Sequence, residues 1–185
     1  MRDGSLNNKP EVTVLKETPV SLLMDGDGGL GYFPAYEGTL RAIEKARAQG
    51  IGVMASRNHG HIGAAGIYSR LTLEHDLVSF VTSGHQMGTS PGASIYAAGG
   101  GSPISFSTPA GEQDPLVLDF GAMHDFYSSS PHRDEIARMA PGVVFRSIGL
   151  GAICQSWGGL LCPDSPWTLN VRPANINTRT KGRWF

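Results

Sequence analysis

Two histidines separated by one residue, His59 and His61, come at the end of a predicted strand, and the small residues 63–66 follow directly. Along an extended segment, side chains two residues apart point to the same side, so both imidazole rings would face one region. Imidazole binds metal ions, and it also exchanges protons near neutral pH because its unperturbed pKa is about 6.5. The bare 63–66 stretch would let a flat ligand or a packed helix approach the backbone closely. The segment therefore predicts either a metal site or a proton-transfer site beside a ligand.

A metal site built on this histidine pair needs at least one further protein ligand. The candidate donors elsewhere in the chain are His85, His124, His132 and Asp119. No H-E-x-x-H or similar spacing supports a metal site, and we predict no metal ligand set. A metal-dependent hydrolase or lyase that uses His59 and His61 stays open as an alternative.

A second candidate motif is formed by Gly26, Gly28 and Gly31, which satisfy the G-x-G-x-x-G pattern of Rossmann units. In a Rossmann unit an acidic residue ends the next strand and binds the ribose. Here Pro34 follows closely, and the next strand runs into residues 56–57, which carry no acid. The chain contains 25 glycines, so we attribute this match to chance.

Hydrophobic periodicity predicts the elements that would position these residues. Strands are expected at residues 12–15, 21–24, 51–55, 77–82, 104–108 and 116–119. Helices are expected at residues 36–50, 61–75, 132–139 and 148–161. The apolar face of the first helix is predicted to contain Tyr36, Leu40 and Ile43, and Gly50 is its expected end. The DGDGGLG run at 25–31 is expected to be a turn, and residues 83–103 a long loop.

Composition narrows the class of protein. The 185 residues include 40% hydrophobic and 17% charged residues, which is typical of a globular chain with one domain's worth of sequence. The formal net charge of −1 provides no basic field, so neither a nucleic-acid partner nor a membrane partner is expected. Cys154 and Cys162 lack zinc spacing and fit a reducing compartment. We see no signal peptide and no apolar run near the roughly 18 residues of a membrane helix, so we expect a cytoplasmic protein.

Six blocks of the sequence, taken in order, carry a more specific resemblance. MDGDGGLG matches V-D-G-D-x-G-x-G, AIEKARAQG matches A-I-x-x-A-x-x-x-G, and RNHGHIGAAGIYSR looks like R-N-S-x-H-F-G-A-A-G-Y-Y. GGGSPISFSTP, LVLDFGA and SIGLGAICQSWGGLL resemble a T-N-P loop, a V-x-D-M-A step and a late glycine-rich helix. These are patterns of the malate/L-lactate dehydrogenase family, which includes sulfolactate, ureidoglycolate and diketogulonate oxidoreductases. The chain resembles this family from Asp25 to Leu161.

The resemblance implies a fold and an activity. The fold would be mixed α/β, a non-Rossmann dinucleotide-binding domain with a largely antiparallel central sheet and flanking helices. The activity would be hydride transfer between NAD or NADP and a small 2-oxo/2-hydroxy acid, in a homodimer. Residues 25–161 would form the cofactor-binding and catalytic core, preceded by an N-terminal segment, residues 1–24. Residues 162–185 form a tail that we cannot assign.

The resemblance also implies roles for individual residues. His61 falls on the active-site histidine, which would exchange a proton with the substrate oxygen during hydride transfer. The expected cofactor contacts are His85, Asp119, Phe120, Gly121 and Arg146. His59 has no expected role in the family.

The chain also departs from the family pattern. Family members are considerably longer and carry an N-terminal helical portion with a further histidine and an arginine of the active site. Nothing before Asp25 resembles that portion. A truncated, non-catalytic remnant that at most binds dinucleotide is therefore a second alternative.

Overall fold

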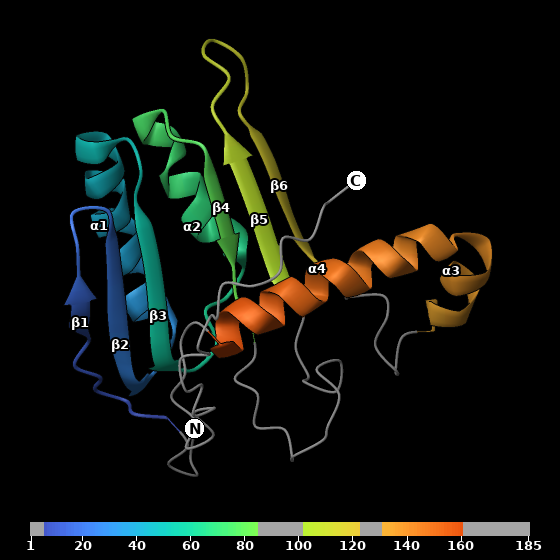
Figure 1. Ribbon diagram of the computed structural model, residues 1–185, viewed down its shortest axis with the longest axis horizontal. Helices are drawn as coiled ribbons and strands as arrows, with labels where there is room; N and C mark the ends of the chain where they lie inside the picture. Colours follow the sequence, from blue (N-terminus) through green and yellow to red (C-terminus); the bar gives the residue numbers. More distant parts are fainter. Residues whose placement is uncertain (1–5, 85–101, 123–130, 161–185) are drawn as a thin grey trace, which may run out of the picture.

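Helices and strands alternate along the first half of the chain. The structure is a computed structural model, and it describes residues 6–84, 102–122 and 131–160 (Figure 1). Its strands are β1 (Thr13–Glu17), β2 (Ser21–Gly29), β3 (Val53–His59), β4 (Ser79–Thr82), β5 (Pro103–Thr108) and β6 (Leu116–Gly121). Its α-helices are α1 (Tyr32–Gln49), α2 (Ala65–Leu71), α3 (Arg133–Met139) and α4 (Pro141–Leu160), and a short 3-10 helix covers Leu73–His75.

The strands form two three-stranded sheets, ordered β1-β2-β3 and β4-β5-β6. In the first sheet β1 and β2 are antiparallel, whereas β2 and β3 are parallel and are connected through α1. The second sheet is antiparallel throughout. The mixed α/β class is therefore confirmed, but the described strands form two small sheets where one central sheet was expected.

Each sheet packs against its own helix, and we call each sheet with its helix one half of the structure. One apolar cluster joins the two halves. In Figure 1, α1 covers one face of the first sheet and α2 covers one face of the second. Ala35 of α1 packs with Ile62 and Tyr68, and Met54 of β3 and Val81 of β4 pack against them. Because these five residues come from both halves, their contact fixes α2 relative to the first sheet.

Helix α1 differs from its prediction at its start and in its buried face. It begins at Tyr32, four residues earlier than expected, and it ends as predicted at Gly50, which has a φ of 83°. Tyr36 and Leu40 are exposed, whereas Ala35 and Ile43 are buried. The predicted face was right for Ile43 but wrong for Tyr36 and Leu40, because α1 turns small residues such as Ala35 and Gly38 toward the sheet and leaves its aromatic rings exposed.

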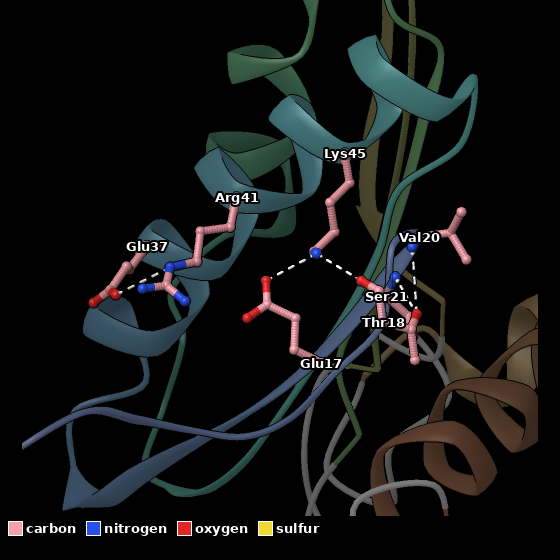
Figure 2. A network of polar contacts seen from close by, with 7 residues as sticks. All are labelled: Glu17, Thr18, Val20, Ser21, Glu37, Arg41 and Lys45. Carbon is pink, nitrogen blue, oxygen red and sulfur yellow. Dashed lines mark hydrogen bonds and ion pairs between the residues drawn. The ribbon is translucent and has the colours of Figure 1, made fainter.

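Lys45 links α1 to the β1–β2 turn (Figure 2). Its Nζ lies 2.8 Å from Glu17 Oε1 and donates a hydrogen bond to the carbonyl oxygen of Thr18 at 2.7 Å. The Thr18 side chain in turn accepts hydrogen bonds from the backbone N–H groups of Val20 and Ser21. The turn is therefore closed by its own side chains and held to the helix by one cation.

The glycine-rich run is only partly a turn. Strand β2 continues to Gly29, and its pairing with β3 becomes irregular between Asp25 and Gly29. Asp27 and Gly28 have φ values of 50° and 67°, which is the left-handed region. The predicted turn is thus a bulge within a strand, because the chain resumes its pairing with β3 after the positive-φ residues.

The carboxylate of Asp25 is the polar centre of this bulge. Its Oδ1 accepts hydrogen bonds from the Asp27 N–H and from Asn58 Nδ2, both at 2.8 Å, and its Oδ2 lies 3.3 Å from Arg57 Nε. Burial alone would raise the pKa of Asp25, but these hydrogen bonds and the charge of Arg57 outweigh burial and hold the pKa below its ordinary value.

Asp25→Asn is expected to lower the free energy of unfolding by about 1–2 kcal/mol near neutral pH, because the amide replaces an ionised acceptor. The folded pKa lies below the ordinary value of 3.8, so this stabilisation is present above that value and is lost as the pH falls through the folded pKa. Urea unfolding near neutral pH and again well below the ordinary pKa should show the difference from wild type shrinking in acid. The control Asp114→Asn, at an exposed loop position, should change neither value. A difference of equal size at both pH values would contradict the assigned cause.

The second sheet buries its hydroxyl side chains and not its aromatic ones. In strand β5, Ser105 and Ser107 face α2 and are buried. On the opposite face Ile104 is buried, whereas Phe106 is exposed. Buried and half-buried hydroxyl groups bond to one another between α2 and the sheet and within the sheet, and we call them the hydroxyl seam. The hydroxyl seam consists of Ser69, Thr72, Ser79, Ser105 and Ser107.

Helix α4 crosses one end of the second sheet and extends away from it to α3 (Figure 1). It begins at Pro141, seven residues before the predicted start, and Cys154 and Leu150 pack with Ile104 and Ala122.

Within the described ranges, no single helix is long and apolar enough to span a membrane. The pair Arg133–Met139 and Pro141–Trp157, bent by 119°, meets that test only jointly, by length and composition.

Candidate functional site

The loop that carries His61 is bonded to the glycine-rich run. The Gly31 N–H donates to the carbonyl oxygen of His61 at 3.1 Å, and the Gly60 N–H donates to that of Gly29 at 2.8 Å. A Cβ on Gly31 would lie 2.5 Å from the Gly60 carbonyl oxygen and 2.6 Å from Ile62 Cγ2. The run therefore holds the loop by close backbone contact, and the space that a pyrophosphate would need beside Gly31 is filled by the chain itself.

The imidazole of His61 is exposed and keeps one nitrogen available. Its Nδ1 accepts a hydrogen bond from the Gly63 N–H at 3.0 Å. The Tyr32 ring meets it edge to face, with 6.4 Å between the ring centroids. None of the described residues forms a hydrogen bond with Nε2. A ligand can therefore reach His61 through Nε2.

The contact with Gly63 also fixes which tautomer is present. Because Nδ1 accepts, the neutral ring carries its hydrogen on Nε2. Proton transfer through Nε2 alternates between the doubly protonated ring and the ring protonated on Nδ1 alone, and neither form can accept from the Gly63 N–H. The hydrogen bond from Gly63 must therefore open if His61 transfers protons through Nε2.

His59 has a different environment. Its Nε2 lies 2.9 Å from Ser56 Oγ, and its Nδ1 lies 2.8 Å from the Gly60 carbonyl oxygen. A carbonyl can only accept, so Nδ1 carries the hydrogen and the Ser56 hydroxyl donates to Nε2. Both ring nitrogens are thus engaged within the chain, and the part of the chain that the structure describes contains no group of three side chains able to hold a metal ion. His85 and His124 lie outside the described residues.

Asp119 lies beside the first turn of α2, which directly follows the His61 loop. It pairs with Ser105 in the sheet, so its side chain shares the face that packs on α2. A Cβ on Gly66 would lie 2.1 Å from Asp119 Oδ2, and that oxygen is 3.6 Å from Arg70 Nη1. The absence of a side chain at Gly66 is what lets the carboxylate reach the helix.

The other predicted cofactor residues do not lie together near Asp119 and the start of α2. Phe120 pairs with Ile104 and lies on the opposite face of the sheet from Asp119. Gly121 ends β6 opposite Pro103. Arg146 is an exposed residue in the first half of α4, the half that extends toward α3 in Figure 1. His85 is outside the described residues. The structure therefore brings His61 and Asp119 to α2 and leaves Arg146 apart from them.

Sequence reasoning missed Tyr32 and Arg70, which contact the two residues that α2 brings together. Tyr32 follows the glycine run directly, and its hydroxyl group covers Gly63. Arg70 lies one helical turn after Gly66. The i, i+4 spacing of Gly66 and Arg70 was a usable signal, because it leaves a basic side chain above a bare helix position.

Comparison with known proteins identifies the family of this chain. A family model described as malate/L-lactate dehydrogenase matches residues 1–123 of the 185. The chain belongs to the malate/L-lactate dehydrogenase family. Five of the six resembling blocks lie within the matched residues, as do His61 and Asp119, whereas Arg146 lies beyond them.

Family relatives agree in sequence and in fold. Malate dehydrogenase from Pyrococcus abyssi is 33% identical over 116 residues, 63% of this chain and 32% of the relative. L-sulfolactate dehydrogenase from Methanocaldococcus jannaschii is 36% identical over 88 residues, 48% of this chain and 26% of the relative. The solved malate dehydrogenase of Pyrococcus horikoshii OT3 superposes with a TM-score of 0.56 at 31% identity, over 65% of this chain and 34% of that one. The chain thus matches about a third of the length of these family members.

Proposed function

We propose that this chain contributes the proton-transfer histidine and a cofactor contact of an NAD(P)-dependent oxidoreductase that acts on small 2-oxo/2-hydroxy acids. The observation that carries the proposal is the state of His61. This residue lies in the part of the chain that the family model matches, its ring is exposed, and its Nε2 is available to a ligand.

The residues near α2 fit a dinucleotide by their chemistry. Asp119 presents a partly exposed carboxylate, which can accept hydrogen bonds from ribose hydroxyl groups. Arg70 presents a more exposed guanidinium that can pair with a phosphate. A bound nicotinamide cofactor supplies the hydride or accepts it. His61 then gives a proton to the substrate oxygen, or removes one, through Nε2.

The first test is a titration of the purified chain with NADH and NADPH, followed by nicotinamide fluorescence. Saturable binding is expected, and Asp119→Asn should weaken it by about tenfold, because an ionised hydrogen-bond acceptor is lost. Arg146→Gln is the second cofactor variant, since the family resemblance assigns Arg146 to a phosphate. The absence of binding in a folded sample would refute the cofactor part of the proposal.

His61→Asn should abolish reduction of 2-oxo acids and leave cofactor affinity unchanged. General acid–base assistance contributes about 10²–10⁴ in rate, so turnover should fall by at least two orders of magnitude. The matched control is His75→Asn, in the 3-10 helix, which should retain full turnover. An active wild type whose His61→Asn variant kept its rate would show that another group moves the proton.

Two further parts of the proposal, turnover by this chain and its oligomeric state, are tested separately. Cofactor binding without turnover would favour the alternative of a non-catalytic dinucleotide-binding chain. We also propose a homodimer, and sedimentation equilibrium of the purified chain measures it directly.

A further inference from the structure

A half-open groove lies on the outer side of α1. It encloses about 620 Å³ between α1, α2 and the segment before β1. Helix α1 contributes Tyr32, Phe33, Tyr36 and Glu37, and α2 contributes Ile67 and Tyr68. The Tyr32 ring also contacts the His61 ring, but His61 does not line the groove, so the groove is a neighbour of the candidate site.

Three aromatic rings of the groove are accessible, and a fourth is held in place beneath them. Tyr32, Phe33 and Tyr36 are between 42% and 54% exposed, so much of each ring is open to solvent. Tyr68 is buried, and its hydroxyl group donates to the carbonyl oxygen of Ile62, which holds the ring in place. Rings whose faces are accessible attract cations, because the face of the π-system carries negative charge density.

The charged residue of the groove also favours a positively charged ligand. Glu37 is the only charged residue among the described residues that line it, and none of these is a lysine, arginine or histidine. Glu37 Oε1 lies 3.5 Å from Arg41 Nε, one turn along α1, as Figure 2 shows. Both side chains are close to half exposed, and such surface pairs are weak and screened by salt. Glu37 can therefore exchange Arg41 for a bound cation.

We propose that this groove binds a compact organic cation that carries a quaternary ammonium group. The apolar substituents of the ligand lie against Tyr32, Phe33 and Tyr36, and its positive charge faces Glu37. An anion would meet ring faces and a carboxylate, both of which repel it. The proposal does not depend on the proposed dehydrogenase activity.

The test compares choline with its uncharged isostere 3,3-dimethylbutan-1-ol, each titrated into the whole chain at low salt and followed by protein NMR shifts. Choline should bind about fivefold or more tightly than the isostere, because only choline gains the cation–ring and carboxylate attraction. Glu37→Gln should weaken choline binding about threefold or more and leave the isostere unaffected. Tyr36→Leu, which keeps apolar volume but removes a ring, should also weaken choline.

The matched control is Glu44→Gln on the same helix. Glu44 also pairs with an arginine, Arg47, at 3.5 Å, but it does not line the groove, so its removal should leave choline binding unchanged. Equal affinity for choline and the isostere, no choline binding, or equal effects of Glu37→Gln and Glu44→Gln would overturn the proposal. Self-association that buries the groove at the concentrations used would also overturn it, because the occupant would then be a second copy of the chain.

Discussion

Gly52→Ala should lower the free energy of unfolding by about 3 kcal/mol, the upper part of the range for overpacking. A Cβ at this position would lie 2.0 Å from the carbonyl oxygen of Ala42 and 3.0 Å from the backbone nitrogen of Ala46. Both atoms belong to the backbone of α1, so the helix as a whole must move away from β3 to make room. Chemical denaturation followed by circular dichroism measures the loss.

The control for this prediction is Gly149→Ala. A Cβ on Gly149 in α4 meets no atom within 4 Å, and an alanine there should raise stability by up to about 1 kcal/mol through helix propensity. If Gly52→Ala cost less than about 1 kcal/mol, α1 would not be seated on β3 as closely as described.

Tyr68→Ala should cost about 3–5 kcal/mol of stability, as is usual when a large buried side chain is removed from a core. The Tyr68 ring is the largest member of the cluster that joins the two sheets through Ala35, Ile62 and their neighbours. Burial, with a further contribution from nearby Tyr32, raises the pKa of Tyr68 to about 12, so the phenol stays protonated and continues to donate to the Ile62 carbonyl.

Two companion variants separate the parts of this effect in thermal or urea unfolding. Tyr68→Phe keeps the ring and removes the hydroxyl donor, so it should cost only about 1–2 kcal/mol, the price of leaving the Ile62 carbonyl unpaired. Tyr36→Ala removes an exposed tyrosine of α1 and should change stability by no more than about 0.5 kcal/mol. Similar losses for Tyr68→Ala and Tyr36→Ala would mean that the cluster is not the joint between the two halves.

Elements with a strong local signal could be predicted from the sequence. Gly50 ends α1 in the left-handed conformation because a glycine adopts it without steric cost, and this was readable in advance. The short strands β3 to β6 were found within a few residues for a similar reason, because each is a short run of strand-forming residues between breaks in the pattern.

Tertiary contacts decide which residues are buried, and the hydrophobic pattern of the sequence did not predict this for α1 and β5. The predicted buried face of α1 contained Tyr36 and Leu40, yet Gly38 and Thr39 are buried in their place. A residue's hydrophobicity says how much free energy its burial would yield, but the fit between helix and sheet decides which side turns inward. Strand β5 shows the same limit, because Ser105 is buried by hydrogen bonding while Phe106 is left open.

The sequence proposed only some residues of the candidate site, and it could not predict the geometry of the site. His61 and Asp119 were proposed from a resemblance, and the approach of Asp119 to α2 depends on Gly66, whose bare backbone admits the carboxylate. The roles assigned to His61, Asp119 and Arg146 stay predictions, and the NADH and NADPH titrations test them.

The hydroxyl seam has a consequence for how the site tolerates change. Apolar surfaces can slide past each other at low cost, but the Ser69–Ser105 hydroxyl pair and the hydrogen bond from Ser107 Oγ to the Ser69 carbonyl oxygen, each at 2.7 Å, are lost when α2 is displaced by a fraction of an ångström. These hydrogen bonds therefore fix the position of α2 on the second sheet. The separation of His61 and Asp119 should drift little when bulky residues of the first sheet are exchanged, and most when one of these small serines is enlarged.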